Sequence, residues 1–368
     1  MKKKYNGITG LRGLTACAIA YVFHYLILFK VMPVDNPAVE RIIAAIAYMT
    51  LSASDVFFVM SGFLMAKKYS GRVIEHFDDY IVPKIKKIFP LMISTAIFVF
   101  ALENIGLKLF GDYPLHADGG DVRYSLTALI LNLLGLQTGF IADGDTYAVN
   151  GPSWFVSVIF ICQILFYVVE RCIKKQKYQN CIFVVMFVIG LVCIIVPIEF
   201  PLMYSCVGRG YVGYFSGVLM WRVTSRIYDM KQDYYIFFKE GSVIIAYLLA
   251  ALSAYISLKK KNNGVTSETY IILLAFWICM TFIVVYGSIS SRFFGFKPFV
   301  WLGERAMVIF LCNIPTDLLL VFIDKYFELN KNYGATDVWL VHIIISLVVV
   351  SVVYMLDMRV VQPLIKGK

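Results

Sequence analysis

Residues 180–198, NCIFVVMFVIGLVCIIVPI, contain no charged side chain and a single amide. An α-helix of about 20 apolar residues is long enough to cross the ~30 Å hydrocarbon core of a bilayer. Membrane barrels instead consist of segments of about 10 residues that alternate between apolar and polar side chains. Segment 180–198 is therefore predicted to be a transmembrane helix, and stretches of the same kind recur along the chain.

The composition extends this prediction to the whole chain. Its 368 residues are 60% hydrophobic and 16% charged, and the mean hydropathy is +0.75. A soluble globular domain carries about 25% charged residues, because polar groups must cover its surface. The composition excludes a soluble enzyme, a disordered chain and a nucleic-acid-binding domain. It indicates a helical membrane protein whose main partner is the lipid bilayer.

The apolar segments predict about ten spans and leave no room for a separate soluble domain. The expected spans are 8–31, 40–66, 91–110, 153–173, 180–198, 209–225, 240–258, 268–288, 299–323 and 338–360. The whole chain, 1–368, is therefore predicted to be one polytopic transmembrane domain of the all-α class.

The basic residues predict how these helices are oriented. The formal net charge is +10, and the Lys and Arg of polytopic membrane proteins collect in cytoplasmic loops. We place Met1–Lys4, the clusters at 171–177 and 222–231, and both termini on the cytoplasmic side of the cell membrane. This explanation is simpler than affinity for nucleic acid, which is not an expected partner. Basic loops also fit an anionic cytosolic substrate or anionic lipid.

Two segments are predicted to lie at a membrane surface. Segment 123–141 is apolar, but a crossing there would move both basic clusters to the outer side, so we expect a shallow or re-entrant outer helix. In segment 67–90, apolar residues recur at helical spacing between basic ones: Ile74, Phe77, Tyr80 and Ile81. This pattern predicts an amphipathic interfacial helix on the cytoplasmic side that continues into the third span.

Ionisable side chains inside apolar segments are costly to bury and mark candidate functional sites. Arg12 lies about one turn from the cytoplasmic end of the first span, and His24 follows ~18 Å further along an α-helix. His24 is thus expected beyond the midplane, and imidazole is well suited to proton transfer near neutral pH. The structural alternatives are snorkelling of Arg12 to the interface and a helix-bridging hydrogen bond by His24.

Other polar residues in or beside the spans are candidates for substrate binding: Asp55, Ser61, Trp154, Arg209, Glu304 and Asn313. Asp55 would pair with a buried cation or orient an imidazole, and Ser61-Gly62 would permit close helix packing. Trp154 fits an interfacial aromatic belt equally well. Glu304 and Arg305 fit a simple interfacial pair.

The eight cysteines and four histidines are scattered along the sequence. They form no Cys-x-x-Cys pair and no cluster at metal-ligand spacing, so neither a metal site nor a disulfide framework is predicted. Most of the cysteines lie in or beside apolar runs, where a thiol behaves as a small buried hydrophobe.

Several motifs, in order along the chain, resemble those of the acyltransferase-3 family of integral membrane O-acyltransferases. Gly10-Leu11-Arg12-Gly13-Leu14 with His24 is similar to the opening Arg-to-His motif, and Ser54–Leu64 to the Phe-Phe-x-x-Ser-Gly-Phe motif. Lys87-Ile88-Phe89-Pro90 is similar to the Arg-Ile-x-Pro motif, and Gly151–Ser157 to the Trp-containing entry of the fourth span. Arg209 with Phe215-Ser216-Gly217 resembles an Arg…Phe-x-x-Gly-like stretch. Leu302-Gly303 with Phe310-Leu311 resembles the late Leu-Gly…Tyr-Leu-x-His motif.

The sequence departs from the family pattern in two places. Lys84, Lys86 and Lys87 precede Pro90 where the family favours Arg, and Lys lacks the bidentate geometry of guanidinium. Asn313 stands where the late motif commonly has His, and an amide cannot carry protons at neutral pH. The hydrolase-like extracytoplasmic domain that some members carry is not expected here.

The resemblance implies transfer of an acyl group, usually acetyl, from cytosolic acyl-CoA to a hydroxyl of a glycan or another envelope molecule. Acetyl-CoA would be the donor, and no metal is implied. His24 would act as general base or carry the acyl group itself, and Arg12 would hold CoA or stabilise negative charge. Lys84, Lys86 and Lys87 would bind the polyanionic end of CoA at the inner face.

Two other classes of function fit ten spans with buried polar groups. One is a transporter or flippase for a glycan, lipid or polyol, and the other is a membrane sensor or scaffold. Only an acyltransferase would release free CoA thiol from acetyl-CoA when an acceptor is present.

Overall fold

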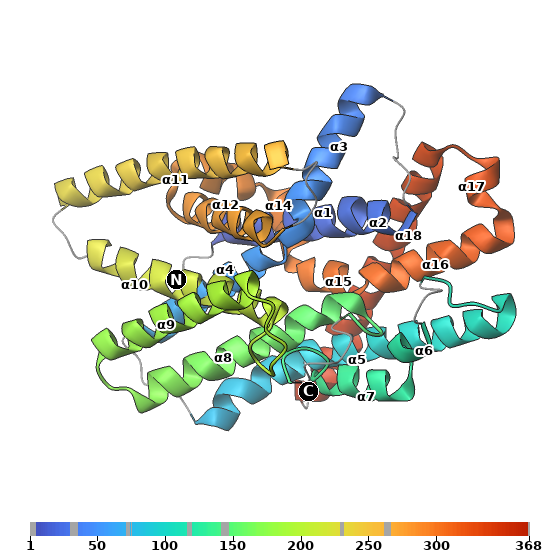
Figure 1. Ribbon diagram of the computed structural model, residues 1–368, viewed down its shortest axis with the longest axis horizontal. Helices are drawn as coiled ribbons and strands as arrows, with labels where there is room; N and C mark the ends of the chain where they lie inside the picture. The colour runs from blue at the N-terminus through green and yellow to red at the C-terminus, as the bar shows by residue number, and fades with distance from the viewer. Residues whose placement is uncertain are drawn as a thin grey trace. The chain divides into compact units, whose positions relative to one another are not determined.

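The computed structural model describes residues 5–29, 36–70, 74, 76–115, 120–140, 147–228, 232–260 and 266–366. All regular structure in these ranges is helical (Figure 1), which confirms the predicted all-α class. The basic start Met1–Lys4, on which the predicted orientation depends, lies outside the described residues.

The chain forms two compact units. Unit 1 comprises Met1–Thr15, Tyr48–Phe77 and Val158–Glu304, and unit 2 comprises Ala16–Ala47, Asp78–Ser157 and Arg305–Lys368. The single domain over 1–368 stays a prediction.

The helices, in chain order, are α1 Asn6–Ala18, η1 Ile19–His24, α2 Tyr25–Phe29, α3 Pro37–Met49, η2 Thr50–Ser52, α4 Asp55–Tyr69, α5 Phe77–Phe110, α6 Gly120–Arg123, α7 Leu126–Leu134, η3 Gly151–Ser153, α8 Trp154–Cys172, α9 Gln176–Ile195, α10 Ser205–Tyr228, α11 Gln232–Lys260, α12 Ser267–Tyr286, α13 Ser288–Phe294, α14 Lys297–Glu304, α15 Ala306–Leu311, α16 Asn313–Phe327, α17 Leu329–Asn332, α18 Ala335–Leu356, η5 Asp357–Val361 and α19 Gln362–Lys366.

In the described part of the chain, six helices are long and apolar enough to cross a membrane: Phe77–Phe110, Gly151–Cys172, Gln176–Ile195, Lys239–Lys259, Ser267–Tyr286 and Ala335–Ile365. A seventh span results if Pro37–Ser52 and Asp55–Tyr69, which are bent by 49°, cross together. These seven coincide with seven of the predicted spans, and the protein is a multi-pass membrane protein.

The remaining three predicted spans are not uniformly apolar helices, and the count of about ten is not confirmed. Span 8–31 is divided into α1, η1 and α2, and span 299–323 into α14, α15 and α16. Span 209–225 lies within the 24-residue helix α10, which is not among the six apolar helices and contains several Gly, Tyr and Ser residues as well as arginines. These three segments hold five candidate site residues: Arg12, His24, Arg209, Glu304 and Asn313. Candidate polar side chains are therefore frequent in the irregular or less apolar helices, and two of these five, Arg209 and Asn313, are buried.

Both predicted surface segments are helical in part. α5 begins at Phe77 and runs unbroken to Phe110, as expected for an interfacial helix that continues into a span. Tyr80 and Ile81 are buried and Phe77 is exposed, while residues 71–73 and 75 lie outside the described ranges.

In segment 123–141, α7 has only nine residues, capped by the Ser125 hydroxyl and ended by Gly135 at φ +68°. Its length of ~13 Å is under half of the hydrocarbon core. The segment therefore does not cross as a single helix.

Glycines allow the helices of unit 1 to pack closely. A Cβ on Gly303 of α14 would lie 1.7 Å from the Thr9 carbonyl oxygen of α1. A Cβ on Gly62 of α4 would lie 1.9 Å from the Tyr214 carbonyl oxygen of α10. The close approach predicted for Ser61-Gly62 is thus present, with small residues where two backbones meet.

We expect Gly303→Ala to destabilise the protein by about 1–3 kcal/mol, because its methyl group would overlap the α1 backbone. Gly241→Ala is the matched control, since a Cβ at this position of α11 meets nothing within 4 Å. The control should be neutral or stabilising by up to ~1 kcal/mol, because alanine favours helix over glycine. Thermal unfolding of both variants in one detergent is the measurement. Equal midpoints would contradict the packing.

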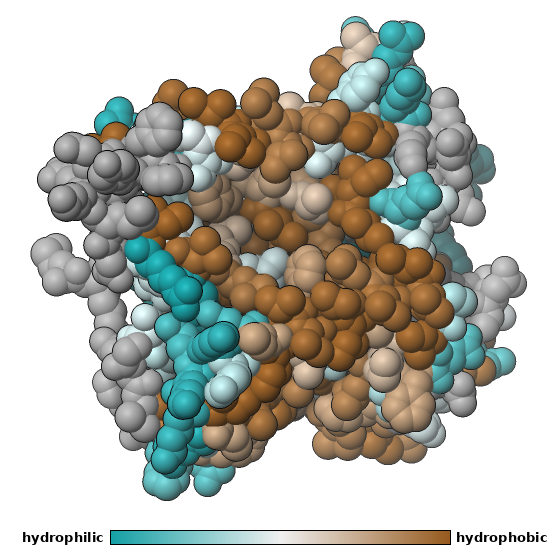
Figure 2. Space-filling model, turned by 60° about the vertical axis from the view of Figure 1, so that its left-hand side comes forward, coloured by the Kyte–Doolittle hydropathy of each residue, from teal (hydrophilic) through white to brown (hydrophobic). Residues whose placement is uncertain are grey.

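The outward side chains of the long helices are apolar. Ile244, Ile245 and Leu248 of α11 are 58–66% exposed, and Ile344 and Val348 of α18 are 60% and 57% exposed. Figure 2 shows hydrophobic residues over much of the visible face. Soluble monomers rarely expose contiguous apolar surface of this kind, so these helix faces fit contact with lipid.

Candidate functional site

The predicted site residues are divided between the two units. Unit 1 contains Arg12, Asp55, Ser61, Arg209 and Glu304, and unit 2 contains His24, Lys84, Lys86, Lys87, Trp154 and Asn313. Contacts within each unit show which of these side chains lie together.

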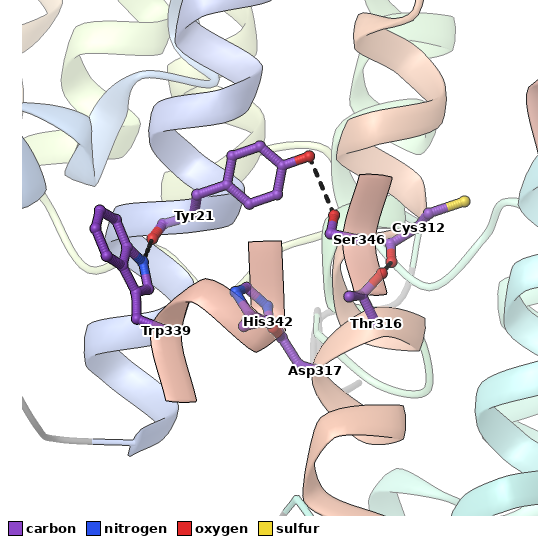
Figure 3. Close-up of polar contacts among 7 residues, drawn as sticks. All are labelled: Tyr21, Cys312, Thr316, Asp317, Trp339, His342 and Ser346. Carbon is purple, nitrogen blue, oxygen red and sulfur yellow. Dashed lines mark hydrogen bonds and ion pairs between the residues drawn. The ribbon is translucent and has the colours of Figure 1, made fainter. Parts of the chain in front are cut away.

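His24 is the last residue of η1, a π-helical segment between α1 and α2. Such turns are rare inside α-helices and frequently occur at functional sites. The indole N–H of Trp339 on α18 donates to the Tyr21 carbonyl oxygen at 2.7 Å (Figure 3), so a backbone acceptor inside the turn has a side-chain donor. His24 itself is half-buried, with its ring edge-on to Phe23. Its imidazole is thus held on an irregular turn.

A buried carboxylate–imidazole pair lies beside η1 and joins α16 to α18. His342 Nε2 and Asp317 Oδ1 are 2.7 Å apart, and the two side chains are 1% and 0% exposed. Because the carboxylate accepts, the imidazole donates from Nε2. The His342 ring centroid is 5.4 Å from that of Tyr25, the residue that follows His24. The pair therefore packs directly against the end of η1.

One face of α18 contacts η1 and α16 through polar side chains. Trp339, His342 and Ser346 follow at intervals of three and four residues, which places them on one side of the helix. The Ser346 hydroxyl donates to Tyr21 Oη at 3.1 Å (Figure 3). The buried stripe of α18 also contains Val338 and Val350. This helix therefore buries one polar face against η1 and leaves the others apolar.

Two atoms of the buried pair have no hydrogen-bond partner among the described residues: Asp317 Oδ2 and His342 Nδ1. Both amide atoms of Asn313, one turn earlier on α16, are also buried and unpartnered there. Buried polar groups normally find a partner in protein or water. These atoms therefore mark a place for a water or a polar group of a bound molecule.

The entry to α8 is a second polar cluster of unit 2. Asn150 Nδ2 donates to Thr95 Oγ1 at 2.9 Å and to the Leu311 carbonyl oxygen at 3.0 Å. Ser153 Oγ accepts from Asn132 Nδ2 at 2.9 Å. The cluster fixes the start of α8 against the end of α15, immediately before Asn313.

Trp154 lies within this entry and is only 5% exposed, so it does not belong to a lipid-facing aromatic belt. Its ring meets those of Tyr147 and Phe155 edge-on. The preceding Val149 has φ +58°, which is strained for a β-branched residue. Such strain persists only where the surroundings enforce it. The entry to α8 is therefore a rigid, buried element.

In unit 1, Asp55 pairs with a buried cation. Of its two predicted roles, pairing with a cation and orienting an imidazole, the structure shows the first. Arg209 Nη2 lies 3.0 Å from Asp55 Oδ1, with the two side chains 8% and 0% exposed. Arg209 also donates to Ser54 Oγ at 3.0 Å, and its guanidinium carbon lies 5.0 Å from the centre of the Tyr270 ring. The pair joins α4 to α10, and its charges are mutually compensated.

Arg12 has a backbone partner instead of snorkelling freely. Its Nε and Nη2 donate to the Gly303 carbonyl oxygen at 3.2 and 2.8 Å, and it interacts electrostatically with Glu304. A cation at a helix C-terminus is favourable, and Gly303 is near the end of α14. Arg12 is therefore fixed between α1 and α14.

In unit 2, the Arg305 guanidinium carbon lies 4.3 Å from the ring centre of Tyr354.

A family model described as an acyltransferase domain, Acyl_transf_3, matches residues 5–358. The chain belongs to the acyltransferase-3 family. No curated protein and no solved structure matches it. Because the acyltransferase-3 match covers nearly the whole chain, both units belong to the family domain, and the protein is a membrane acyltransferase.

The three lysines of the acyltransferase-3 motif before Pro90 lie on the first turns of α5. Lys84 Nζ donates to the Tyr80 carbonyl oxygen at 2.8 Å. Lys86 and Lys87 are exposed. Two of the three ammonium groups therefore lie at the surface, where an anionic substrate can reach them.

Two residues of this acyltransferase-3 chain were not predicted as site residues, Asp317 and His342. The available signal was that each is an ionisable group within an apolar segment. Their proximity was not readable, because they lie on different helices. Among the described residues, no group of three or more His, Cys, Asp or Glu side chains is placed to hold a metal ion.

Proposed function

We propose that this acyltransferase moves an acyl group, most simply acetyl, from cytosolic acyl-CoA to a hydroxyl of a cell-envelope glycan. The observation that supports this best is the half-buried His24 on its π-helical turn, in a chain of the acyltransferase-3 family. Acylation of an alcohol requires removal of the hydroxyl proton. An imidazole at a reachable position is suited to that step.

Two routes use His24. As general base, it takes the proton of the acceptor hydroxyl while the oxygen attacks the thioester carbon, the C–S bond breaks, and the thiolate then receives the proton. As nucleophile, it forms an N-acyl bond as the thiolate leaves. In a second step the acceptor oxygen takes the acyl group, the N-acyl bond breaks, and the hydroxyl proton passes to the thiolate. Either route contributes on the order of 10²–10⁴ in rate.

Acyl-CoA is proposed to enter from the cytoplasmic side, where we also place both termini. The polyanionic end of CoA fits the exposed ammonium groups of Lys86 and Lys87. Lys84 donates to the Tyr80 carbonyl oxygen, which orients its ammonium group. The acceptor hydroxyl is proposed to reach His24 from the outer side.

The double variant Lys86→Gln, Lys87→Gln is expected to raise KM for acetyl-CoA about tenfold, equivalent to ~1.4 kcal/mol of lost binding. KM for S-acetylpantetheine, which lacks the nucleotide phosphates, should not change. Lys331→Gln is the control, because Lys331 is exposed on the short helix α17. An equal rise in KM for both donors would contradict the assignment.

Release of free CoA thiol tests the reaction itself. The purified protein in nanodiscs should release thiol from acetyl-CoA when an envelope glycan fraction is supplied, and the glycan should gain an ester-linked acetyl group by mass spectrometry. The surface glycans of a deletion strain should lack that ester. A transporter or flippase would move glycan without consuming acetyl-CoA, and that result would overturn the proposed function.

A further inference from the structure

A buried acidic group near the end of η1 has no role in the reaction described above. The Asp317 carboxylate favours a positive charge on His24, and His342 opposes such a charge when its own ring is protonated. The His342 ring contacts Tyr25, the residue that follows His24, which places the pair at the end of η1. Asp317 itself is 0% exposed and is held through Oδ1, while Oδ2 is unpartnered among the described residues.

We propose that Asp317 is the counter-ion for the positive charge that forms on His24 during acyl transfer, and that His342 is the positioning residue that holds its carboxylate. This inference rests on the proposed acyl transfer at His24. It assigns a function to two residues that carry no role in the reaction so far.

The need for a counter-ion follows from the chemistry of both routes. When His24 accepts the proton of the acceptor hydroxyl, it becomes an imidazolium until the thiolate takes the proton. When it attacks the thioester instead, the C–S electron pair leaves with sulfur, and the ring becomes a cationic N-acylimidazole. In each case the ring is neutral again at the end of the cycle. A transient cation therefore forms on His24 by either route.

The surroundings make the interaction between this cation and a carboxylate strong. Coulomb attraction grows as the local dielectric constant falls, and bulk water does not screen a carboxylate that is fully buried. The carboxylate is also in place before the reaction, so no reorganisation is needed when the charge develops. Asp317 is therefore placed to stabilise the charged state more than the neutral one.

The geometry favours a positioning role for His342 over a role as second base. Its Nε2 is used by Asp317, and its Nδ1 is buried. The ring packs among those of Tyr21, Tyr25 and Phe29. An acceptor hydroxyl reaches half-buried His24 more readily than this enclosed nitrogen. The function of His342 is thus to donate a hydrogen bond that fixes Asp317.

Substitutions that keep shape and remove charge test this assignment. Asp317→Asn should lower kcat for acetyl transfer about 10²–10³-fold, the range seen when one preorganised electrostatic group is removed. KM for acetyl-CoA should change little, because Asp317 acts on the charged state. Asp324→Asn is the matched control, since Asp324 is a partly exposed carboxylate on the same helix whose oxygens accept hydrogen bonds from Asn330. It should leave kcat unchanged.

His342 is tested by a conservative pair of variants. His342→Gln keeps an N–H donor for Asp317 and should retain most of kcat, whereas His342→Leu removes the donor and should lose kcat as Asp317→Asn does. If the Asp317→Asn protein does not accumulate in membranes, the two His342 variants still test the contact between His342 and Asp317. A His342→Gln protein as inactive as His342→Leu would show that the ring itself carries protons, and would overturn the positioning role.

The wild-type protein, measured in parallel, separates this inference from the proposed function. Acetyl transfer by wild type together with an unchanged kcat in Asp317→Asn overturns the counter-ion alone. Absence of thiol release by wild type with every acceptor fraction overturns the proposed function and the counter-ion with it. Every variant is compared at equal membrane abundance.

Discussion

His24→Ala is expected to lower acetyl incorporation into envelope glycan by at least 10²-fold, and by up to about 10⁴-fold. The substitution removes the group that we propose takes the acceptor proton or carries the acyl group. The half-buried position of His24 makes its loss a small change in packing. Protein abundance in the membrane should therefore stay close to wild type, and thiol release from acetyl-CoA is the direct measurement.

His76→Ala is the matched control for this prediction. His76 precedes α5 and is exposed, so its removal tests for a general effect of losing an imidazole. The control should retain wild-type activity. Wild-type incorporation in His24→Ala at equal abundance would remove His24 from the reaction under both routes.

Breaking the buried ion pair of unit 1 is expected to have the largest effect on stability. Asp55→Leu leaves Arg209 as an uncompensated buried charge, and such changes cost about 3–5 kcal/mol. The double variant Asp55→Leu, Arg209→Met removes both charges and should recover much of this loss, because paired apolar replacements are often neutral. Chemical unfolding in detergent, analysed as a double-mutant cycle, gives the coupling free energy between Asp55 and Arg209.

An exposed ion pair provides the comparison. Lys331 and Glu328 lie 2.8 Å apart with side chains 73% and 56% exposed. Lys331→Gln should change stability by no more than ~1 kcal/mol, since solvent screens such pairs. If Asp55→Leu were equally mild, the Asp55–Arg209 pair would not be a structural element of the α4–α10 contact.

Apolar periodicity and length were enough to predict the helical class and the spans that face lipid. They were not enough for the segments that contain Arg12, His24 and Asn313, where the helices break into shorter pieces. A hydropathy pattern measures whether a segment tolerates lipid. It carries no information on whether a polar segment surrounded by other helices stays straight.

The π-helical turn at His24 could not be predicted from local sequence. Nothing in the sequence of Ile19–His24 distinguishes it from an α-helix. Trp339, whose indole N–H donates to the Tyr21 carbonyl oxygen in this turn, is 318 residues from Tyr21. Likewise, the choice between the two roles of Asp55 depended on Arg209, 154 residues along the chain. The polar residues proposed for the site were visible in the sequence, but their partners came from tertiary packing.

The contacts of α18 with η1 mean that the two ends of the polypeptide meet beside the proposed catalytic residue His24. A chain terminated before Ala335 would keep the whole opening Arg-to-His motif, yet it would lose the indole and hydroxyl donors to Tyr21 and the histidine beside Asp317. Reporter fusions after Lys366 leave this arrangement intact, whereas truncation mapping would assign a catalytic defect to a region far from His24 in sequence.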